Sequence, residues 1–365
     1  MRCIRTRRPL VCAVLASVLS ISALTACGSD SGGGGGGGGG GASAAGSGSG
    51  DVAVSAAQAC TKAKQEQGDL SYVASTDEAV FAKEIAGFEA KYPYIKVKYT
   101  NLRSSDATQR LLVEQQARHS LDFDAMAGEI GGFDPLFQAG LVRTVDWAKL
   151  GLPPNLVLEH GGANLIRNYR LFTGIGYNSK LVKPGELPTT WQDLINSKWA
   201  GKIIVDPRGQ YLGGLALAWG ASKTTEWFKQ FMATDKPLII QGATASGQKV
   251  IAGEALVTTS AADANIREAQ AAGAPIAIKY LDVVPTSDYY TLIMKTTPRP
   301  NKAACFLSWM IGPDGAKQKE KYEFQFNVDK AADLPSGSQV VLADTPDKIK
   351  LQTDEAGALA KLMSK

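Results

Sequence analysis

The chain has 365 residues, two histidines, five cysteines and a formal net charge of +4. Its excess of positive charge comes from Arg2, Arg5, Arg7 and Arg8 near the N-terminus, so the remainder is close to neutral. A remainder without runs of basic residues argues against binding to nucleic acid.

The first 26 residues are typical of a secretory signal peptide. A basic segment is followed by an apolar run from Leu10 to Leu24, which is too short to span a bilayer comfortably. The run ends in Leu24-Thr25-Ala26-Cys27-Gly28, which resembles a lipobox, the site at which bacterial lipoproteins are cleaved and acylated. We therefore expect residues 1–26 to be removed and Cys27 to carry lipid. An ordinary secretory signal with an unrelated cysteine is the alternative.

Residues 27–52 are expected to form a flexible tether. Gly32 to Gly41 is an unbroken glycine run, and Ala, Ser and Gly continue to Gly50. Such a composition cannot bury a core. The tether would keep an extracytoplasmic domain at the cell membrane through its lipid anchor only. Roughly 300 residues then remain, enough for one large or two medium domains.

Two cysteines remain after the signal peptide and the lipidation site. Cys3 and Cys12 leave with the signal peptide, and Cys27 is modified, so Cys60 and Cys305 are left as a pair. Outside the cytosol such a pair often forms a disulfide. We predict a Cys60–Cys305 bond, with two separate buried thiols as the alternative.

Short apolar strands alternate with amphipathic helices after an N-terminal arm at 53–67. The strand 70–74, a helix with apolar residues spaced from Phe81 to Tyr92, and the strand 95–99 form a β-α-β unit. Uninterrupted apolar strands are typical of sheets covered on both faces. Further strands are expected at 123–127, 172–178, 202–205, 237–241, 255–259 and 276–280, and helices at 107–118, 134–139, 191–197, 213–219, 225–232, 246–252, 265–271 and 301–311.

Catalytic patterns are absent from the sequence. His119 and His160 lie outside any motif with a nucleophile, and no HExxH, CxxC, GxSxG or P-loop pattern occurs. A zinc site would need more ligands than these two histidines. We therefore expect neither enzymatic activity, nor a cofactor, nor a resident metal.

The stretch from Leu70 to about Val328 resembles the extracellular solute-binding proteins of ABC importers, and within them the group that includes the ferric-iron-binding proteins. The most specific match is 187–194 followed by 199–203. The other segments that carry the resemblance are 88–93, 124–129, 174–178, 298–304 and 312–315.

The resemblance implies an α/β, type II periplasmic-binding-protein fold, in which two lobes close around a small solute. Two strand crossings are expected, near Arg170–Asn178 and Tyr280–Tyr290. Lobe 1 would comprise 68–169 and 286–330, lobe 2 would comprise 170–285, and 331–365 would be a C-terminal segment. The domain is expected to act as a monomer that delivers its solute to the permease and ATPase of the importer.

Hydroxyl side chains follow the first two expected strands. Ser75 and Thr76 stand between a strand and its helix, where hydroxyls and free N–H groups can hold an anion or a polar group. Ser105 stands in the same relation to the next helix. Helix capping is the alternative at both places, since Ser75 and Glu78 have capping-box spacing.

The loop after the strand 202–205 is the favoured ligand loop. Arg208 offers a fork of donors suited to carboxylate or phosphate, Gly209 allows a ligand near the backbone, and Tyr211 follows. A solvated turn arginine is the alternative. Arg267 could add charge or could form a surface ion pair.

The resemblance places Glu129 where the ferric binders have an acidic metal ligand. This chain departs from them at their adjacent tyrosines, where it has Asp263-Ala264. Tyr289 and Tyr290, near the second crossing, could supply phenolates or an aromatic wall. We therefore favour a small anionic or polar organic solute that bears phosphate or carboxylate.

Three alternatives stay open. Ferric iron, bare or as a chelate, could bind through Glu129 with Asp263 or Tyr289. A lipoprotein of the same fold could instead serve sensing or interaction rather than transport. A hydrolase would need a nucleophile–base pair in the cleft.

Overall fold

The computed structural model describes residues 51–117, 123–329, 331 and 333–364. The expected signal peptide, the lipidated Cys27 and residues 27–50 of the tether lie outside the described residues, as does His119. Within the described part of the chain, no helix has the length and apolar character needed to cross a bilayer.

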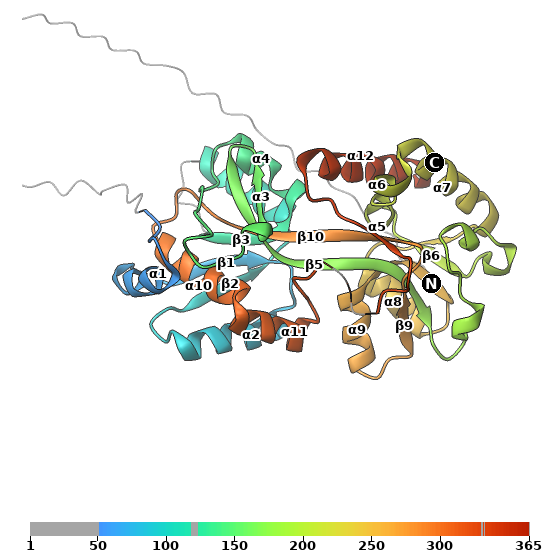
Figure 1. The fold of residues 1–365 in the computed structure, drawn as a ribbon, viewed down its shortest axis with the longest axis horizontal. Helices are drawn as coiled ribbons and strands as arrows, with labels where there is room; N and C mark the ends of the chain where they lie inside the picture. Colours follow the sequence, from blue (N-terminus) through green and yellow to red (C-terminus); the bar gives the residue numbers. More distant parts are fainter. Residues whose placement is uncertain (1–50, 118–122, 330, 332, 365) are drawn as a thin grey trace, which may run out of the picture. The chain divides into compact units, whose positions relative to one another are not determined.

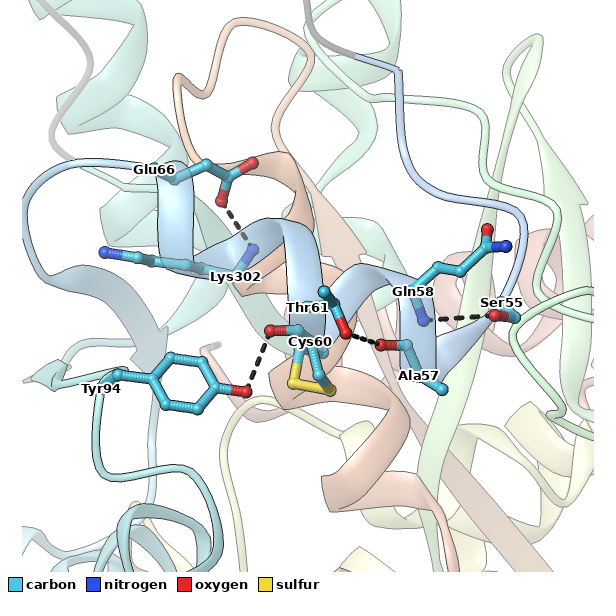
Figure 2. Close-up of a disulfide and its surroundings, with 9 residues drawn as sticks. Ser55, Ala57, Gln58, Cys60, Thr61, Glu66, Tyr94 and Lys302 are labelled. Atoms are coloured by element: carbon cyan, nitrogen blue, oxygen red, sulfur yellow. Dashed lines mark hydrogen bonds between the residues drawn. A yellow bond between two sulfur atoms is a disulfide. The ribbon is translucent and has the colours of Figure 1, made fainter.

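The N-terminal arm is helical and is bound to lobe 1. Helix α1 (Ala56–Lys62) lies against α10 (Pro300–Ile311), and a disulfide joins Cys60 to Cys305 across a Cα–Cα distance of 4.8 Å. Figure 2 shows this bond beside Tyr94, whose hydroxyl donates to the Cys60 carbonyl at 2.9 Å. Glu66 then accepts the backbone N–H groups of Asn301 and Lys302 at the start of α10. The C-terminal end of the arm is therefore held at the N-terminus of α10.

Lobe 1 is built on a three-stranded parallel sheet. Strand β1 (Leu70–Ala74) pairs on one side with β2 (Val97–Asn101) and on the other with β3 (Ala125–Glu129). Asp77 caps α2 (Glu78–Lys91) by accepting the N–H groups of Ala79 and Val80, so Ser75 does not have that role. The other helices of lobe 1 are α3 (Ser104–Gln116), α4 (Asp134–Gln138), α10 and α11 (Pro313–Glu323).

Two long antiparallel strands join the lobes, which confirms the expected crossings. Strand β5 (Ala163–Asn178) pairs with β10 (Val283–Ile293) from Phe172–Thr286 to Ile166–Thr291. Figure 1 shows β5 and β10 running between the two lobes. Beyond this pairing, β10 continues beside β3 of lobe 1, and β5 continues beside β8 of lobe 2. Strand β4 (Val157–His160) pairs with the first residues of β5.

Lobe 2 surrounds the other end of the sheet. Its order continues from β5 through β8 (Val257–Ala262) and β6 (Ile203–Val205) to β7 (Leu238–Ile239), and β9 (Ile276–Lys279) pairs with β5. The helix expected at 213–219 is two short helices, because the chain turns between them. The helices are α5 (Gln210–Gly213), α6 (Ala216–Trp219), α7 (Ala221–Asp235), α8 (Ala243–Ile251) and α9 (Asp263–Ala271).

The C-terminal segment returns to lobe 2. After α11 the chain passes along β5, where Phe326 bridges Arg170, and forms β11 (Gln339–Val341) beside β10. Helix α12 (Pro346–Met363) then packs against α5, α6 and α7 (Figure 1). Leu359 is buried in the core of lobe 2, whereas Ile349 packs against the lobe 1 core. The segment between α11 and β11, together with α12, therefore connects the lobes in addition to the strands β5 and β10.

Candidate functional site

A cavity of about 560 Å³, which we call the cleft, opens between the lobes on one face of the crossing strands. Its lobe 1 wall follows the carboxyl ends of β1 and β2, and its lobe 2 wall follows the starts of α8 and α9. Ligand sites in α/β sheets occur at such strand ends. The polar residues of the lining are Ser75, Thr76, Asp77, Asn101, Tyr169, Thr244, Asn265, Glu268, Tyr289, Glu323 and Gln325.

Ser75 and Thr76 lie in the cleft as expected from their place after β1. The Tyr99 hydroxyl donates to the carbonyl oxygens of Ala74 and Thr76 at 3.0 and 2.6 Å, which fixes the backbone of this loop. The Thr76 hydroxyl donates in turn to Glu323 Oε2 at 3.3 Å. Ser75 is exposed to the cleft.

Tyr289 belongs to the cleft lining and contacts Glu129, which lies outside that lining and lines a neighbouring cavity beside α12. They are opposite residues of β10 and β3, and the Tyr289 hydroxyl donates to Glu129 Oε1 at 3.0 Å. The Tyr289 ring stacks on Tyr169 of β5, with 4.6 Å between ring centroids. Burial, and then the Glu129 carboxylate, raises the pKa of Tyr289 well above its usual value. The phenol therefore stays protonated at neutral pH.

Asp263 lies beneath the wall of the cleft. It begins α9, is only 3% exposed, and its Oδ1 accepts the Phe172 N–H of β5 at 3.0 Å. Burial raises the pKa of Asp263 to about 6. The next two residues, Ala264 and Asn265, line the cleft instead. The carboxyl group thus ties α9 to a crossing strand.

Arg208 is occupied within its own loop. Its Nε and Nη2 donate to the two carboxylate oxygens of Asp206 at 2.9 and 2.6 Å. The Asp206 bond raises the pKa of Arg208, and Glu129 adds to this across the lobes. Burial raises the pKa of Tyr211 to about 12, and the charges of Asp206 and Glu129 contribute to this increase. The charges of Arg208 and Glu129 both act on Tyr211, and none of these three residues belongs to the cleft lining.

Gly209 serves helix packing, which corrects the expectation that this glycine makes room for a ligand. Its φ is +69°, and a Cβ there would lie 2.4 Å from the carbonyl oxygen of Ala356 in α12. Gly213 likewise faces Gln352 and Ala356. Gly209 does allow another group to approach its backbone closely, but that group is helix α12 and not a ligand.

The other predicted residues have local partners outside the cleft lining. Arg267 pairs with Asp333 at 2.7 Å, which is the surface ion pair named as its alternative. The Ser105 hydroxyl donates to Asp106, and the Tyr290 hydroxyl donates to Asp288 at 3.3 Å. Tyr290 lines a second cavity of about 210 Å³ beside α12. His160 is paired with Asp134 at 2.8 Å, away from both cavities.

Sequence reasoning missed several residues of the lining. Asn101 ends β2 and Thr244 lies in the first turn of α8, so each follows the strand-end rule that selected Ser75. Glu268 lies one turn into α9, and helix periodicity could have indicated it. Glu323 had no local signal, because its position depends on how α11 packs.

The described lining of the cleft contains acidic residues and no basic ones. The acidic residues are Asp77, Glu268 and Glu323. Among the residues that the structure describes, no three His, Cys, Asp or Glu side chains group as a metal site would require. The Tyr289 hydroxyl and Glu129 Oε1 form a pair of hard oxygen atoms between the cleft and the neighbouring cavity beside α12.

This geometry, with two lobes, crossing strands and a polar cleft at strand ends, defines a binding protein that closes on a solute. The chain belongs to the bacterial extracellular solute-binding protein family, whose profile matches residues 67–317. It is an extracytoplasmic solute-binding protein of an ABC importer, which confirms the expected family and fold. The family is non-enzymatic, in agreement with the sequence prediction.

Solved structures share this fold. Iron-bound HitA from Pseudomonas aeruginosa has a TM-score of 0.65 at 17% identity, with 82% of this chain and 100% of that chain covered. FutA from Trichodesmium, in complex with iron and citrate, has 0.62 at 19% identity, with 81% and 98% covered. AfuA from Actinobacillus pleuropneumoniae, with fructose-6-phosphate bound, has 0.63 at 17% identity, with 81% and 97% covered. No curated protein sequence matches the chain.

Proposed function

We propose that the cleft captures ferric iron as a complex with a small carboxylate-bearing anion, for delivery to the permease and ATPase of the importer. The observation that carries this proposal is the contact between the Tyr289 hydroxyl and Glu129 Oε1 at 3.0 Å. Carboxylate and phenolate oxygens are hard ligands, which suit a hard cation. The carboxyl groups of Asp77 and Glu268 in the cleft lining favour positive charge nearby.

A complex fits better than a bare ion. The described residues supply one carboxylate and one phenol at this point and no cluster of three acidic or histidine ligands, so a chelating anion would complete the coordination. A cavity of about 560 Å³ has room for such an anion. Support also comes from the similar folds of HitA, which is iron-bound, and FutA, which holds iron and citrate.

Metal binding would displace the proton that Tyr289 shares with Glu129. Because burial and Glu129 both raise the pKa of Tyr289, only a strong Lewis acid would ionise this phenol at neutral pH. Capture of ferric iron should therefore release a proton and produce the visible charge-transfer absorption of a phenolate–iron bond.

The second candidate is a phosphate- or carboxylate-bearing organic solute without iron. It is favoured by the guanidinium of Arg208, whose donors suit a phosphate or carboxylate group and on which the charge of Glu129 acts. AfuA, of similar fold, holds fructose-6-phosphate. In this case the anion would have to compete with Asp206, which now accepts two hydrogen bonds from the Arg208 side chain.

Thermal shift and visible spectroscopy on the protein from residue 51 onward separate the candidates. Ferric citrate should raise the Tm and produce the absorption band, whereas citrate alone and fructose-6-phosphate should do neither. Tyr289→Phe should abolish the band, and Tyr290→Phe, whose hydroxyl faces Asp288 instead, should retain it. A shift with fructose-6-phosphate that is lost in Arg208→Ala would replace iron by the second candidate.

We further propose the anchoring and the division into lobes that the sequence indicates. Residues 1–26 are removed, Cys27 is acylated, and residues 27–52 form the tether between the lipid and the folded domain. Lobe 1 consists of 68–169 with 286–330, and lobe 2 of 170–285. Mass spectrometry of the protein isolated from membranes should show lipid attached to Cys27 at the new N-terminus; an unmodified Cys27 would rule out the lipid anchor. Adjacent permease and ATPase genes would separate transport from a sensory role.

A further inference from the structure

Two carboxyl groups are buried together behind the cleft. Glu84 of α2 is fully buried, and Glu323 at the end of α11 is 6% exposed and belongs to the cleft lining. Lys319, one turn earlier in α11, is 3% exposed, with its Nζ 3.7 Å from Glu84 Oε1. One lysine thus faces two acids in the interior of lobe 1.

The hydrogen bonds of this cluster are incomplete. Glu323 Oε2 accepts the Thr76 hydroxyl, and Lys319 donates to Asn168. Glu323 Oε1 and both oxygens of Glu84 have no hydrogen-bond partner among the described residues, although Lys319 pairs with Glu84 Oε1 at 3.7 Å. Buried oxygens are normally satisfied, so a shared proton or an ordered water is required here. The adjoining space, lined by Thr76, Lys319 and Glu323, is about 10 Å³, which admits about one water.

The backbone next to Glu323 is held in an uncommon conformation. Phe324 has a φ of 53°, and among the described non-glycine residues only Lys236 shares a positive φ. Such strain persists where the surrounding structure over-determines it, and it is concentrated at functional sites. The turn places Glu323 at the buried pair and Gln325 in the cleft lining.

We infer that Glu323 is a positioning residue of the cleft: its carboxyl group shares one proton with Glu84 and holds Thr76, so that solute capture depends on this proton. The inference rests on the proposed function only for the identity of the solute. Loss of the proton would leave two carboxylates facing one lysine and would loosen the loop after β1.

The surroundings agree with a neutral Glu323. Burial, and then Glu84, raises the pKa of Glu323 to about 9, and Lys319 only partly opposes them. The titratable groups that face it or its neighbours from the packed elements are Tyr72 of β1, Asp77 and Glu78 before and in α2, Tyr99 of β2, Glu129 of β3, Tyr169 of β5 and Tyr289 of β10.

The sign of the pH effect follows from the raised pKa. A folded-state pKa of about 9 against an ordinary 4.5 means that the folded protein binds the extra proton between these values. The stability contributed by this group is complete below pH 4.5 and declines until about pH 9. Glu323→Gln, which cannot ionise, should lack this decline.

The test uses the protein from residue 51 onward as wild type, Glu323→Gln and Glu323→Ala. Glu355→Gln is the matched control, because Glu355 is also buried, at 3% exposed, and accepts the Thr225 hydroxyl in lobe 2. We expect Glu323→Gln to bind ferric citrate within about twofold of wild type at pH 7 and to lose less affinity than wild type toward pH 10. Glu323→Ala, without the Thr76 contact, should bind about tenfold more weakly. Glu355→Gln should follow wild type.

Solute-free measurements decide the inference even if ferric citrate does not bind. Carbon-13 NMR of labelled glutamate side chains should show one carboxyl with a pKa near 9, absent in Glu323→Gln and present in Glu355→Gln. The Tm of Glu323→Gln should depend less on pH than that of wild type. A Glu323 signal that titrates near 4.5, or identical pH profiles for wild type and Glu323→Gln, would overturn the inference. If ferric citrate does not bind but the solute-free measurements give the expected results, only the proposed identity of the solute is wrong.

Discussion

A Cβ atom on Gly213 would lie 2.6 Å from the backbone carbonyl oxygen of Gln352. This relationship joins α5, at the end of the loop that carries Arg208, to the C-terminal helix α12. Gln352 also donates its side-chain amide to the Thr286 carbonyl of β10 at 3.2 Å. Helix α12 therefore packs against both a lobe 2 loop and a crossing strand. At Gly213 the contact is with backbone atoms, which cannot move aside as a flexible side chain could.

Gly213→Ala should weaken the docking of α12. The added methyl group would overlap the Gln352 carbonyl, and overpacking of this kind costs about 1–3 kcal/mol. The free energy of unfolding from urea titration measures the loss. Gly357→Ala, within α12 but with no heavy atom near its new Cβ, is the control and should gain about 0.5–1 kcal/mol from helix propensity. Equal stability of Gly213→Ala and wild type would contradict the close approach.

Local signals found the elements that bear the site, and contacts between distant parts decided what the site contains. The strand–helix alternation from β1 to β3 is visible in neighbouring residues, and Ser75 and Thr76, which were selected from it, line the cleft. Arg208 and Gly209 have the composition of a ligand loop, but α12, more than 130 residues later, occupies the space beside Gly209.

Glu323 is a cleft residue that the sequence did not indicate. Nothing in its sequence neighbourhood indicates burial, and only the packing of α11 against α2 makes it a buried partner of Glu84 and Thr76. Asp263 was selected because it stands where the resembled ferric binders have adjacent tyrosines, yet its side chain accepts a backbone N–H group from β5. Side-chain direction at such positions depends on pairings across the sheet that one strand does not reveal.

Removal of the disulfide should destabilise lobe 1 without changing the cleft. Cys60 and Cys305 are 245 residues apart, so the bond closes a long loop, and removing a native disulfide costs about 2–5 kcal/mol. The double variant Cys60→Ser/Cys305→Ser should unfold at a lower temperature and still bind the solute. Mass spectrometry without reductant should detect no free thiol in the wild-type protein from residue 51 onward. Alkylation of either cysteine under those conditions would refute the bond.

Asp288→Asn should weaken the junction of the crossing strands. Asp288 of β10 accepts two hydrogen bonds from Arg170 of β5, at 2.5 and 2.6 Å, and Arg170 is 1% exposed. Loss of one partner leaves a buried cation with less compensation, which costs about 3 kcal/mol. Asp344→Asn, in the exposed pair with Lys348, is the control and should unfold like wild type. Similar urea midpoints for both variants would show that the buried pair adds no stability.

Asp263→Asn should flatten the pH dependence of stability between pH 4 and 6. Burial raises the pKa of Asp263 from 3.8 to about 6, so the folded protein holds a proton that the unfolded chain has released. Stability from this group is complete below pH 3.8 and is lost as the pH rises to about 6. The amide does not ionise and should avoid this loss, which is about 3 kcal/mol for a shift of this size. Unfolding free energies of the variant and wild type, measured from pH 4 to 7.5, should therefore diverge in favour of Asp263→Asn with rising pH. Parallel curves would mean that Asp263 ionises normally and that its carboxylate, rather than its acid form, binds the Phe172 N–H.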